Sequence, residues 1–326
     1  MSFDTEIDGL KERLCSPDAG VRRVALLAFA DHEEEDLLPA IAAVLRADPE
    51  PALRADAARA LAGWDDEAVV QALAHALLDE PLVREAAALA LTELKDPLVA
   101  CALVPLASHD DAFVRCAALR ALRELRVPAA AEPALASLRH PQASVRREAV
   151  GVLGWLKHAG ALAPLAGVAT QDADAEVRRA ATGALGAASV ADAASVIPAL
   201  CTALADPQWP VREEAATTLG KLQSADPALR AALRDAMADE FWQVRLRAAR
   251  SLGRHRDALA LPELIAALVH PAGNLRKEAA IALGDIGDPG ARPALEAARA
   301  DPDPEVRKAV GLALQRLQPA GSEARA

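Results

Sequence analysis

Residues Asp206 to Leu222 read DPQWPVREEAATTLGKL, and versions of this stretch recur ten times along the chain of 326 residues. Each copy carries a Val-Arg or Leu-Arg pair, and successive repeat arginines lie 30 to 34 residues apart. These repeat arginines are Arg22, Arg54, Arg84, Arg115, Arg146, Arg178, Arg212, Arg245, Arg276 and Arg307. Alanine follows three residues later in nine copies, and leucine follows seven residues later in nine copies. A period of this length predicts a solenoid of stacked supersecondary units.

Each unit is predicted to hold two helices, of which the second is easier to define. In the seventh copy, Val211, Ala215 and Leu219 share one face at helical spacing. Proline suits the first helical position and marks the start of this helix at Pro51, Pro81 and Pro304. One residue before that position, a capping aspartate is predicted at Asp18, Asp111, Asp174 and Asp303. Glycines near the last turn indicate the helix end at Gly154, Gly186, Gly220, Gly253 and Gly284.

The first helix of each unit is predicted in an alanine- and leucine-rich stretch, such as 196–205 or 261–269. A proline fourteen residues before the next repeat arginine indicates its opening turn, at Pro164, Pro198, Pro262 and Pro293. The sequence therefore predicts an all-α fold, a single α-solenoid (superhelix) of about ten two-helix repeats over residues 1–318. The repeats are approximately 1–32, 33–64, 65–95, 96–127, 128–158, 159–190, 191–224, 225–256, 257–287 and 288–318, with a frayed tail at 319–326.

Composition limits the classes of function. The formal charge of −11 disfavours general binding to nucleic acid. The N-terminus lacks the pattern of a secretory signal, and no window approaches the length of an apolar membrane span, so a cytoplasmic protein is predicted. The four cysteines have no metal-ligand or Cys-x-x-Cys spacing and are interpreted as reduced, buried, small hydrophobic residues: Cys15, Cys101, Cys116 and Cys201.

The repeat resembles the HEAT-like repeat of the phycobilisome lyase family and of many bacterial HEAT-repeat proteins. The resemblance rests on the pattern Asp-Pro, Val-Arg, Ala and Leu-Gly within residues 206–220, repeated at 274–284 and 301–307. It implies a ladder between adjacent repeats, formed by the repeat arginine and an aspartate six residues before it, as at Asp48, Asp172, Asp206, Asp239 and Asp301. In three repeats that place holds histidine, interpreted as a polar turn residue rather than a metal ligand: His109, His140 and His270.

No motif for catalysis is present. HEAT-repeat metal hydroxylases carry several His-Glu pairs, whereas this chain has one, His32-Glu33. The sequence contains no Gly-rich phosphate loop and no Gly-x-Ser-x-Gly elbow. We therefore predict no catalytic residues, no metal site and no cofactor, and we consider an enzyme less probable than a binding protein.

Aromatic residues give the strongest functional signal. The chain has eight Phe and Trp residues, and four fall in the turn before a second helix: Phe113, Trp209, Phe241 and Trp242. Trp209 and Trp242 occupy the same repeat position in consecutive units. Aromatics in register along one rim are typical of the anchors of a protein interface, although Trp also serves as a simple filler of such turns.

Basic residues give a second signal. Positions one, five and nine after the repeat arginine are expected on the exposed, concave face of the second helix, and they include Arg120, Arg147, Arg250 and Arg254. Trp155 lies on the same predicted face. A basic strip would favour an acidic partner, but Glu93, Glu124, Glu213 and Asp285 interrupt it, so a mixed solvated surface is the alternative.

These observations favour a non-catalytic scaffold or adaptor that binds a partner protein, not identified by the sequence, on its concave face. The predicted partner-binding residues are Trp209, Phe241, Trp242, Trp155, Phe113, Arg120, Arg147, Arg250 and Arg254. The family resemblance implies an alternative, a bilin lyase or chromophore chaperone, although no motif for a bilin pocket is present. A HEAT-like DNA glycosylase is a third reading, which the net charge disfavours.

Overall fold

The computed structural model describes residues 3–31 and 35–317, and within them it contains helices and no strand. Two compact units, residues 1–156 and 157–326, are described separately. The His32-Glu33 pair, residue 34 and the predicted frayed tail lie outside the described residues. No described helix is long and apolar enough to span a bilayer.

Unit 1 is a stack of two-helix repeats whose second helices form one layer. That layer consists of α2 (Ala19–Asp31), α4 (Pro51–Ala60), α6 (Pro81–Ala90), α7 (Ala112–Leu125) and α9 (Ala143–Leu156). The first-helix layer consists of α1 (Phe3–Leu14), α3 (Leu38–Ala47), α5 (Glu67–Ala76), the 3-10 helices η3 (Pro97–Ala102) and η4 (Pro105–Ser108), and α8 (Ala131–Ser137). Successive second helices pack on each other, as α4 does on α6 and α7 on α9.

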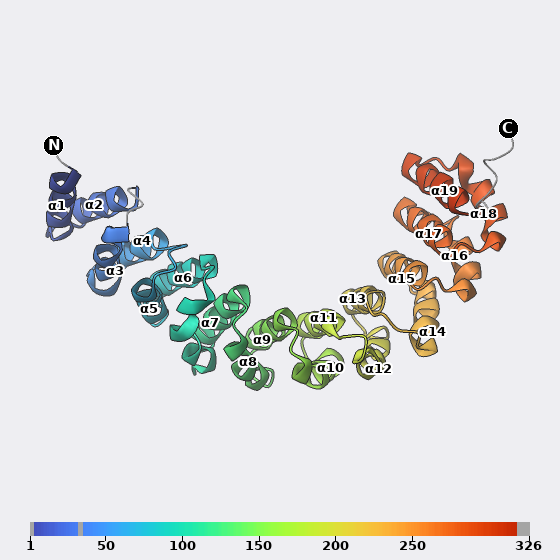
Figure 1. Ribbon diagram of the computed structural model, residues 1–326, viewed down its shortest axis with the longest axis horizontal. Coiled ribbons are helices and arrows are strands. Elements are labelled where there is room, and N and C mark those ends of the chain that lie inside the picture. The colour runs from blue at the N-terminus through green and yellow to red at the C-terminus, as the bar shows by residue number, and fades with distance from the viewer. Residues whose placement is uncertain (1–2, 32–34, 318–326) are drawn as a thin grey trace. The chain divides into compact units, whose positions relative to one another are not determined.

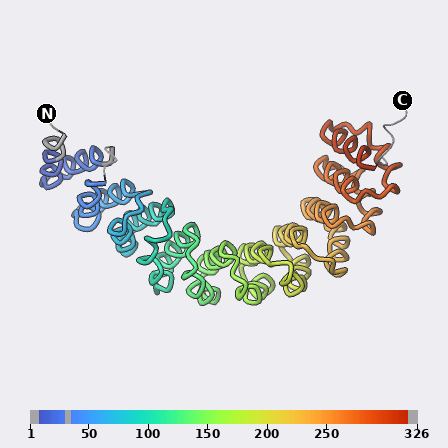
Figure 2. The backbone as a smooth tube through the Cα atoms, in the orientation of Figure 1, coloured from blue at the N-terminus to red at the C-terminus, as the bar shows by residue number. Residues whose placement is uncertain are grey.

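Unit 2 repeats the same arrangement (Figure 1). Its first-helix layer consists of α10 (Leu162–Gln171), α12 (Ala193–Ala203), α14 (Pro227–Asp235), α16 (Leu261–Ala267) and α18 (Arg292–Ala297). Its second-helix layer consists of α11 (Ala175–Ala184), α13 (Trp209–Leu219), α15 (Trp242–Arg254), α17 (Gly273–Ile286) and α19 (Pro304–Arg316). The two-helix hairpin recurs along each unit in Figure 2. The predicted all-α solenoid class is confirmed.

The core consists of the two positions that recur most strictly in the sequence. The residue three after each repeat arginine is 0% exposed in all ten repeats, from Ala25 to Val310. The residue seven after it is at most 2% exposed, from Phe29 to Leu314. One small and one large side chain per repeat therefore form a continuous buried seam, which is why the period alone predicted the fold.

The predicted starts of the second helices are confirmed. Pro51, Pro81 and Pro304 each occupy the first residue of their helices. The side chains of Asp111 and Asp174 accept hydrogen bonds from backbone N–H groups at the starts of α7 and α11. Asp18 and Asp303 do the same at the starts of α2 and α19.

Two predictions about the first helices are wrong. Pro198 lies inside α12, which begins five residues earlier, at Ala193, rather than in an opening turn. The first helix of the fourth repeat is not an α-helix but two 3-10 segments, η3 and η4. Pro105 begins the second segment, where an α-helix would need a backbone N–H that proline lacks.

The predicted glycines lie at or near the ends of the second helices, and Gly220 is the C-cap of α13. None of the five has a positive φ. Among the glycines that the structure describes, only Gly63 and Gly287 do. A Cβ built on Gly253 would lie 2.8 Å from the Cα of Ala282 in the next second helix, and one on Gly284 would lie 2.8 Å from that of Ala313. These two glycines lie in the last turns of their helices and also permit close approach between successive helices.

Candidate protein-binding site

The arginine–aspartate ladder between repeats is confirmed. Arg22 pairs with Asp48, Arg178 with Asp206, Arg212 with Asp239 and Arg276 with Asp301, at nitrogen–oxygen distances of 2.6 to 2.8 Å. Sequence analysis missed a fifth pair, Arg54 with Asp79 at 2.7 Å. Asp79 stands five rather than six residues before Arg84, in the repeat with the shortest spacing, so a search at fixed spacing does not find it.

Each ladder arginine holds two repeats at once. Arg212 donates through Nε and Nη2 to both oxygens of Asp239 in the next repeat, at 2.7 and 3.1 Å. Its Nη1 donates to the carbonyl oxygen of Asp206, 2.9 Å away, in the turn of its own repeat. Only a planar guanidinium presents donors in this geometry, which explains arginine rather than lysine at the ladder positions.

The ladder carboxylates remain ionised. Burial acts to raise the pKa of Asp239, but the hydrogen bonds from Arg212 and from the Phe241 backbone hold that pKa below its ordinary value. The pKa values of Asp48 and Asp206 are lowered by the same balance of causes. The hydrogen bond from Arg276 is the main cause of the lowered pKa of Asp301.

The three histidines replace the ladder aspartate only in part. The Nδ1 atoms of His109, His140 and His270 accept the backbone N–H two residues later, at 3.0, 3.1 and 3.0 Å, as aspartate does elsewhere. His270 Nε2 lies 2.7 Å from Arg245 Nη2. A neutral imidazole whose Nδ1 accepts carries its hydrogen on Nε2, so this contact brings two donors together. Burial and the adjacent arginines lower the pKa of His270.

Two of the predicted aromatic residues of unit 2 stack on each other. The ring of Trp209 stacks on that of Phe241, with centroids 5.5 Å apart and an interplanar angle of 16°. Phe241 is the N-cap of α15 in extended backbone, and Trp242 is the first residue of that helix. All three side chains are half-buried. We name Trp209, Phe241 and Trp242 the aromatic edge of unit 2.

Two of the predicted aromatics also contact ladder arginines. The guanidinium of Arg212 lies 5.5 Å from the Phe241 ring centroid, and that of Arg84 lies 4.6 Å from the Phe113 centroid. Phe113 belongs to unit 1 and packs over an arginine whose repeat partner position holds His109 instead of aspartate. Phe113 is half-buried, like the residues of the aromatic edge, and its role in partner binding stays a prediction.

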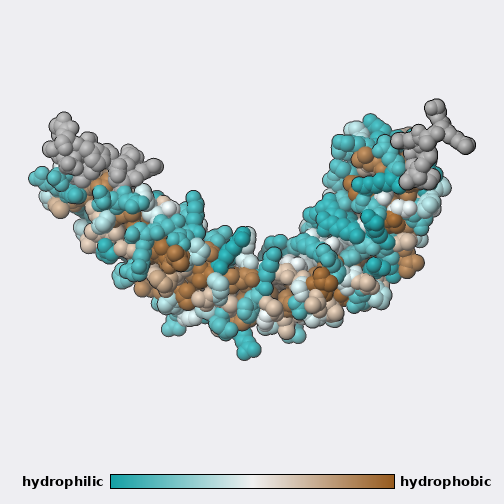
Figure 3. All heavy atoms as spheres, viewed as in Figure 1, coloured by the Kyte–Doolittle hydropathy of each residue, from teal (hydrophilic) through white to brown (hydrophobic). Residues whose placement is uncertain are grey.

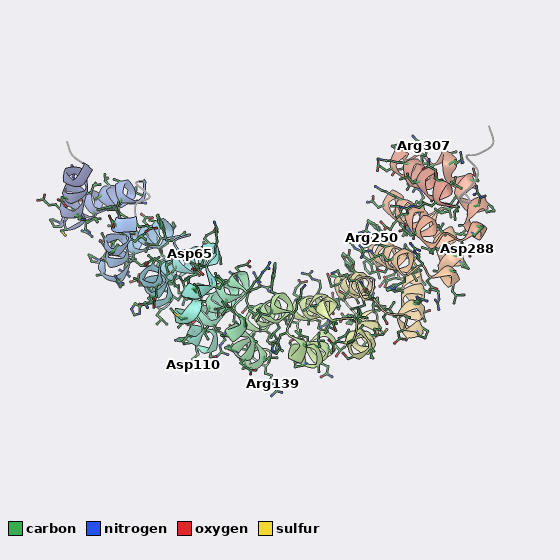
Figure 4. All side chains as sticks on the ribbon, viewed as in Figure 1. Asp65, Asp110, Arg139, Arg250, Asp288 and Arg307 are labelled. Atoms are coloured by element: carbon green, nitrogen blue, oxygen red, sulfur yellow. The ribbon has the colours of Figure 1, made fainter. Side chains whose placement is uncertain are left out.

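Trp155 and the predicted arginines lie on second helices, but the arginines do not form a basic strip. Trp155 is 50% exposed, and Arg126 lies 4.7 Å from its ring centroid in unit 1. Arg120 donates to buried Glu148 at 2.7 Å, and Arg250, marked on α15 in Figure 4, pairs with buried Glu278 at 2.6 Å. The surface is therefore a mixed one, because these glutamates neutralise the arginines.

These two ion pairs share one spacing, which was not predicted. In each pair, the arginine stands five residues after one repeat arginine and the glutamate stands two residues after the following repeat arginine. The spacing could have revealed the pairs, but arginine and glutamate occupy these two positions only twice in the sequence. Arg147 and Arg254, the remaining predicted arginines, are exposed.

Other site chemistry is limited in the described part of the chain. No group of three or more His, Cys, Asp or Glu side chains there could hold a metal ion. The prediction of buried cysteines is wrong: Cys15 and Cys101 are exposed, and Cys116 and Cys201 are half-buried, all with free thiols. Burial raises the pKa of the Cys116 and Cys201 thiols, which lowers their reactivity.

Comparison with known proteins agrees with this geometry. The sequence model of the family described as HEAT repeats matches residues 7–92, 38–122, 75–150, 100–186, 169–240 and 227–315. These matches are to HEAT repeats in general and do not single out the phycobilisome lyase type. A search of curated proteins found no significant match.

Several solved structures share the fold. An engineered protein is 21% identical, with 96% of this chain and 98% of that chain covered and a TM-score of 0.57. YibA of Escherichia coli is 20% identical, with coverages of 75% and 90% and a TM-score of 0.59. Kap95p, solved with RanGDP, is 16% identical, with coverages of 97% and 50% and a TM-score of 0.63.

Proposed function

Since the chain belongs to the HEAT-repeat family, we propose that it is a non-catalytic scaffold that binds a partner protein, with the aromatic edge of unit 2 as its anchor. One observation carries the proposal: Trp209, Phe241 and Trp242 lie half-buried at the starts of α13 and α15, outside the core. The core of this protein uses alanine, leucine and valine almost throughout. Three large rings at one edge are therefore not needed for packing.

Two rings of the aromatic edge, those of Trp209 and Phe241, are held by contacts before a partner arrives. Trp209 is stacked on Phe241, and Phe241 rests against Arg212, whose guanidinium is fixed by Asp239 and the Asp206 carbonyl. A side chain already held in one conformation loses little entropy on binding. Rigid aromatic residues with partial exposure are the usual hot spots of protein interfaces, where truncation to alanine costs about 2 kcal/mol or more.

The surroundings favour a protein partner. Hydrophobic residues reach the visible surface as separate patches among hydrophilic ones in both units (Figure 3), which is typical of a polar interface with local anchors. The ladder arginine Arg212, which is paired with Asp239, offers an ordered polar group beside the aromatic edge. A protein of the same fold, Kap95p, binds RanGDP, so the architecture is compatible with such a role.

Site-specific photocross-linking tests the proposal. A photoreactive phenylalanine analogue replaces Trp242, and a matched variant carries it at Leu259, which is 71% exposed in the same unit. We expect a discrete partner protein cross-linked from position 242 and absent from position 259. The same products from both positions would contradict the assignment of the aromatic edge.

A further inference from the structure

A pocket of about 570 Å³ opens in unit 1 between the first helices of the second and third repeats. Its apolar wall is formed by Leu38 and Pro39 of α3, Val69 of α5 and the indole of Trp64. Trp64 is half-buried and follows Gly63, whose φ of +80° turns the chain sharply after α4. The pocket is therefore formed by ordered elements together with one aromatic side chain.

The rim of this pocket is strongly acidic. Glu35, Asp36, Asp65 and Asp66 line it, together with a single cation, Arg46. Two of the carboxylates have structural duties, because Asp65 accepts the Lys95 backbone N–H and Asp66 accepts that of Val69, both at 2.9 Å. Glu35 and Asp36 are exposed, and no side chain in the described part of the chain forms an ion pair with either.

The apolar wall and the acidic rim together indicate which kind of side chain fits the pocket. An apolar wall with an aromatic face accommodates the aliphatic stem of a long side chain, and carboxylates at the rim attract a cationic head. Lysine and arginine have this construction, whereas an apolar or an acidic side chain would leave the carboxylates unpaired or repelled. The volume admits one or two such side chains and excludes a folded domain.

We propose that this pocket binds a basic linear segment of a partner protein, with an arginine or lysine stem against Trp64 and its charge between the carboxylates of Glu35 and Asp36. Arg46 occupies the same rim and competes with the incoming cation. The site lies in unit 1 and is independent of the aromatic edge in unit 2, so either assignment can fail while the other holds.

Fluorescence anisotropy tests the site with a fluorescein-labelled peptide of alternating arginine and glycine at about 150 mM salt, where long-range attraction is screened. The site variant Glu35→Gln/Asp36→Asn removes two carboxylates without structural duties. The matched variant Asp110→Asn/Glu132→Gln removes two exposed carboxylates elsewhere in unit 1; Asp65 and Asp110 lie well apart in Figure 4. We expect the site variant to weaken binding about fivefold to tenfold and the matched variant to change it less than about twofold.

Tryptophan emission provides a second readout. Addition of the peptide should change the emission of the wild type, and Trp64→Phe should abolish that change while Trp155→Phe keeps it. Equal weakening by the two charge variants would overturn the proposal, since binding would then follow net charge alone. A citrulline peptide that binds as tightly as the arginine peptide would overturn it as well.

Discussion

Replacement of Arg212 by lysine isolates what the ladder contributes to stability. Lysine keeps the charge, but its single ammonium cannot reach both Asp239 oxygens and the Asp206 carbonyl together. The Arg212 and Asp239 side chains are 11% and 9% exposed, so water does not replace the lost contacts. Two lost hydrogen bonds to charged groups, at about 1.5 kcal/mol each, give a cost of about 3 kcal/mol.

Arg307→Lys is the matched control. Among the described residues, Arg307 donates hydrogen bonds only within its own repeat, to the carbonyls of Asp301 and Pro302 at 2.7 and 3.0 Å, and it is exposed. Lysine should therefore cost less than about 1 kcal/mol there. The difference between the two variants measures the contact between repeats.

Urea unfolding followed by circular dichroism gives the total effect of each substitution. Hydrogen exchange with mass spectrometry then locates it, because a repeat array can open one part at a time. In Arg212→Lys we expect faster exchange in α13 and α15. If both variants shift the unfolding curve equally, with unchanged exchange in those helices, the ladder does not couple the repeats as argued.

Three further predictions follow from the same contacts. Gly253→Ala should destabilise by about 1–3 kcal/mol through its clash with Ala282, while Gly311→Ala, with no atom within 4 Å of the added Cβ, should stabilise by about 0.5–1 kcal/mol; thermal unfolding measures both. His270→Asp should raise stability, because two oxygens can accept from the Ala272 N–H and from Arg245 together. Since the folded pKa of His270 is lowered, wild-type stability should fall as pH drops below about 6.5. Urea unfolding measured at several pH values should show that the free energy of unfolding depends less on pH in the variant. Because the ladder aspartates have lowered folded pKa values, their contribution is complete above the unfolded pKa of about 4 and should be lost as pH falls below it, which circular dichroism would follow.

The fold could be predicted from the sequence because its buried positions repeat. Each repeat contributes the same alanine and leucine positions to the core, and the resemblance to HEAT repeats implied the arginine–aspartate ladder. The packing role of the glycines could not be predicted. Local rules place Gly253 near a helix end, where it lies, but they do not reveal its close approach to Ala282, one repeat away in sequence. Asp79 was not predicted because it stands five residues before Arg84, whereas the other ladder aspartates stand six residues before their repeat arginines.

The sequence predicted that aromatic residues lie near the starts of α13 and α15, but it did not predict which rings contact each other. Alignment of the repeats places Trp209 and Trp242 in register, yet Trp209 stacks on Phe241. The reason lies in the backbone: Phe241 is an extended N-cap, while Trp242 already belongs to α15. The acidic pocket beside Trp64 was missed because its carboxylates come from segments about thirty residues apart that the stacking of α3 and α5 brings together.

The most direct test of the proposed function is the affinity of the cross-linked partner for three forms of the protein. These forms are the wild type, Trp209→Ala/Trp242→Ala and the control Leu259→Ala, which removes an exposed hydrophobic side chain from the same unit. With helical content equal by circular dichroism, we expect the double variant to bind at least about tenfold more weakly and the control to bind like the wild type. Equal affinity of all three forms would contradict the assignment of partner binding to the aromatic edge.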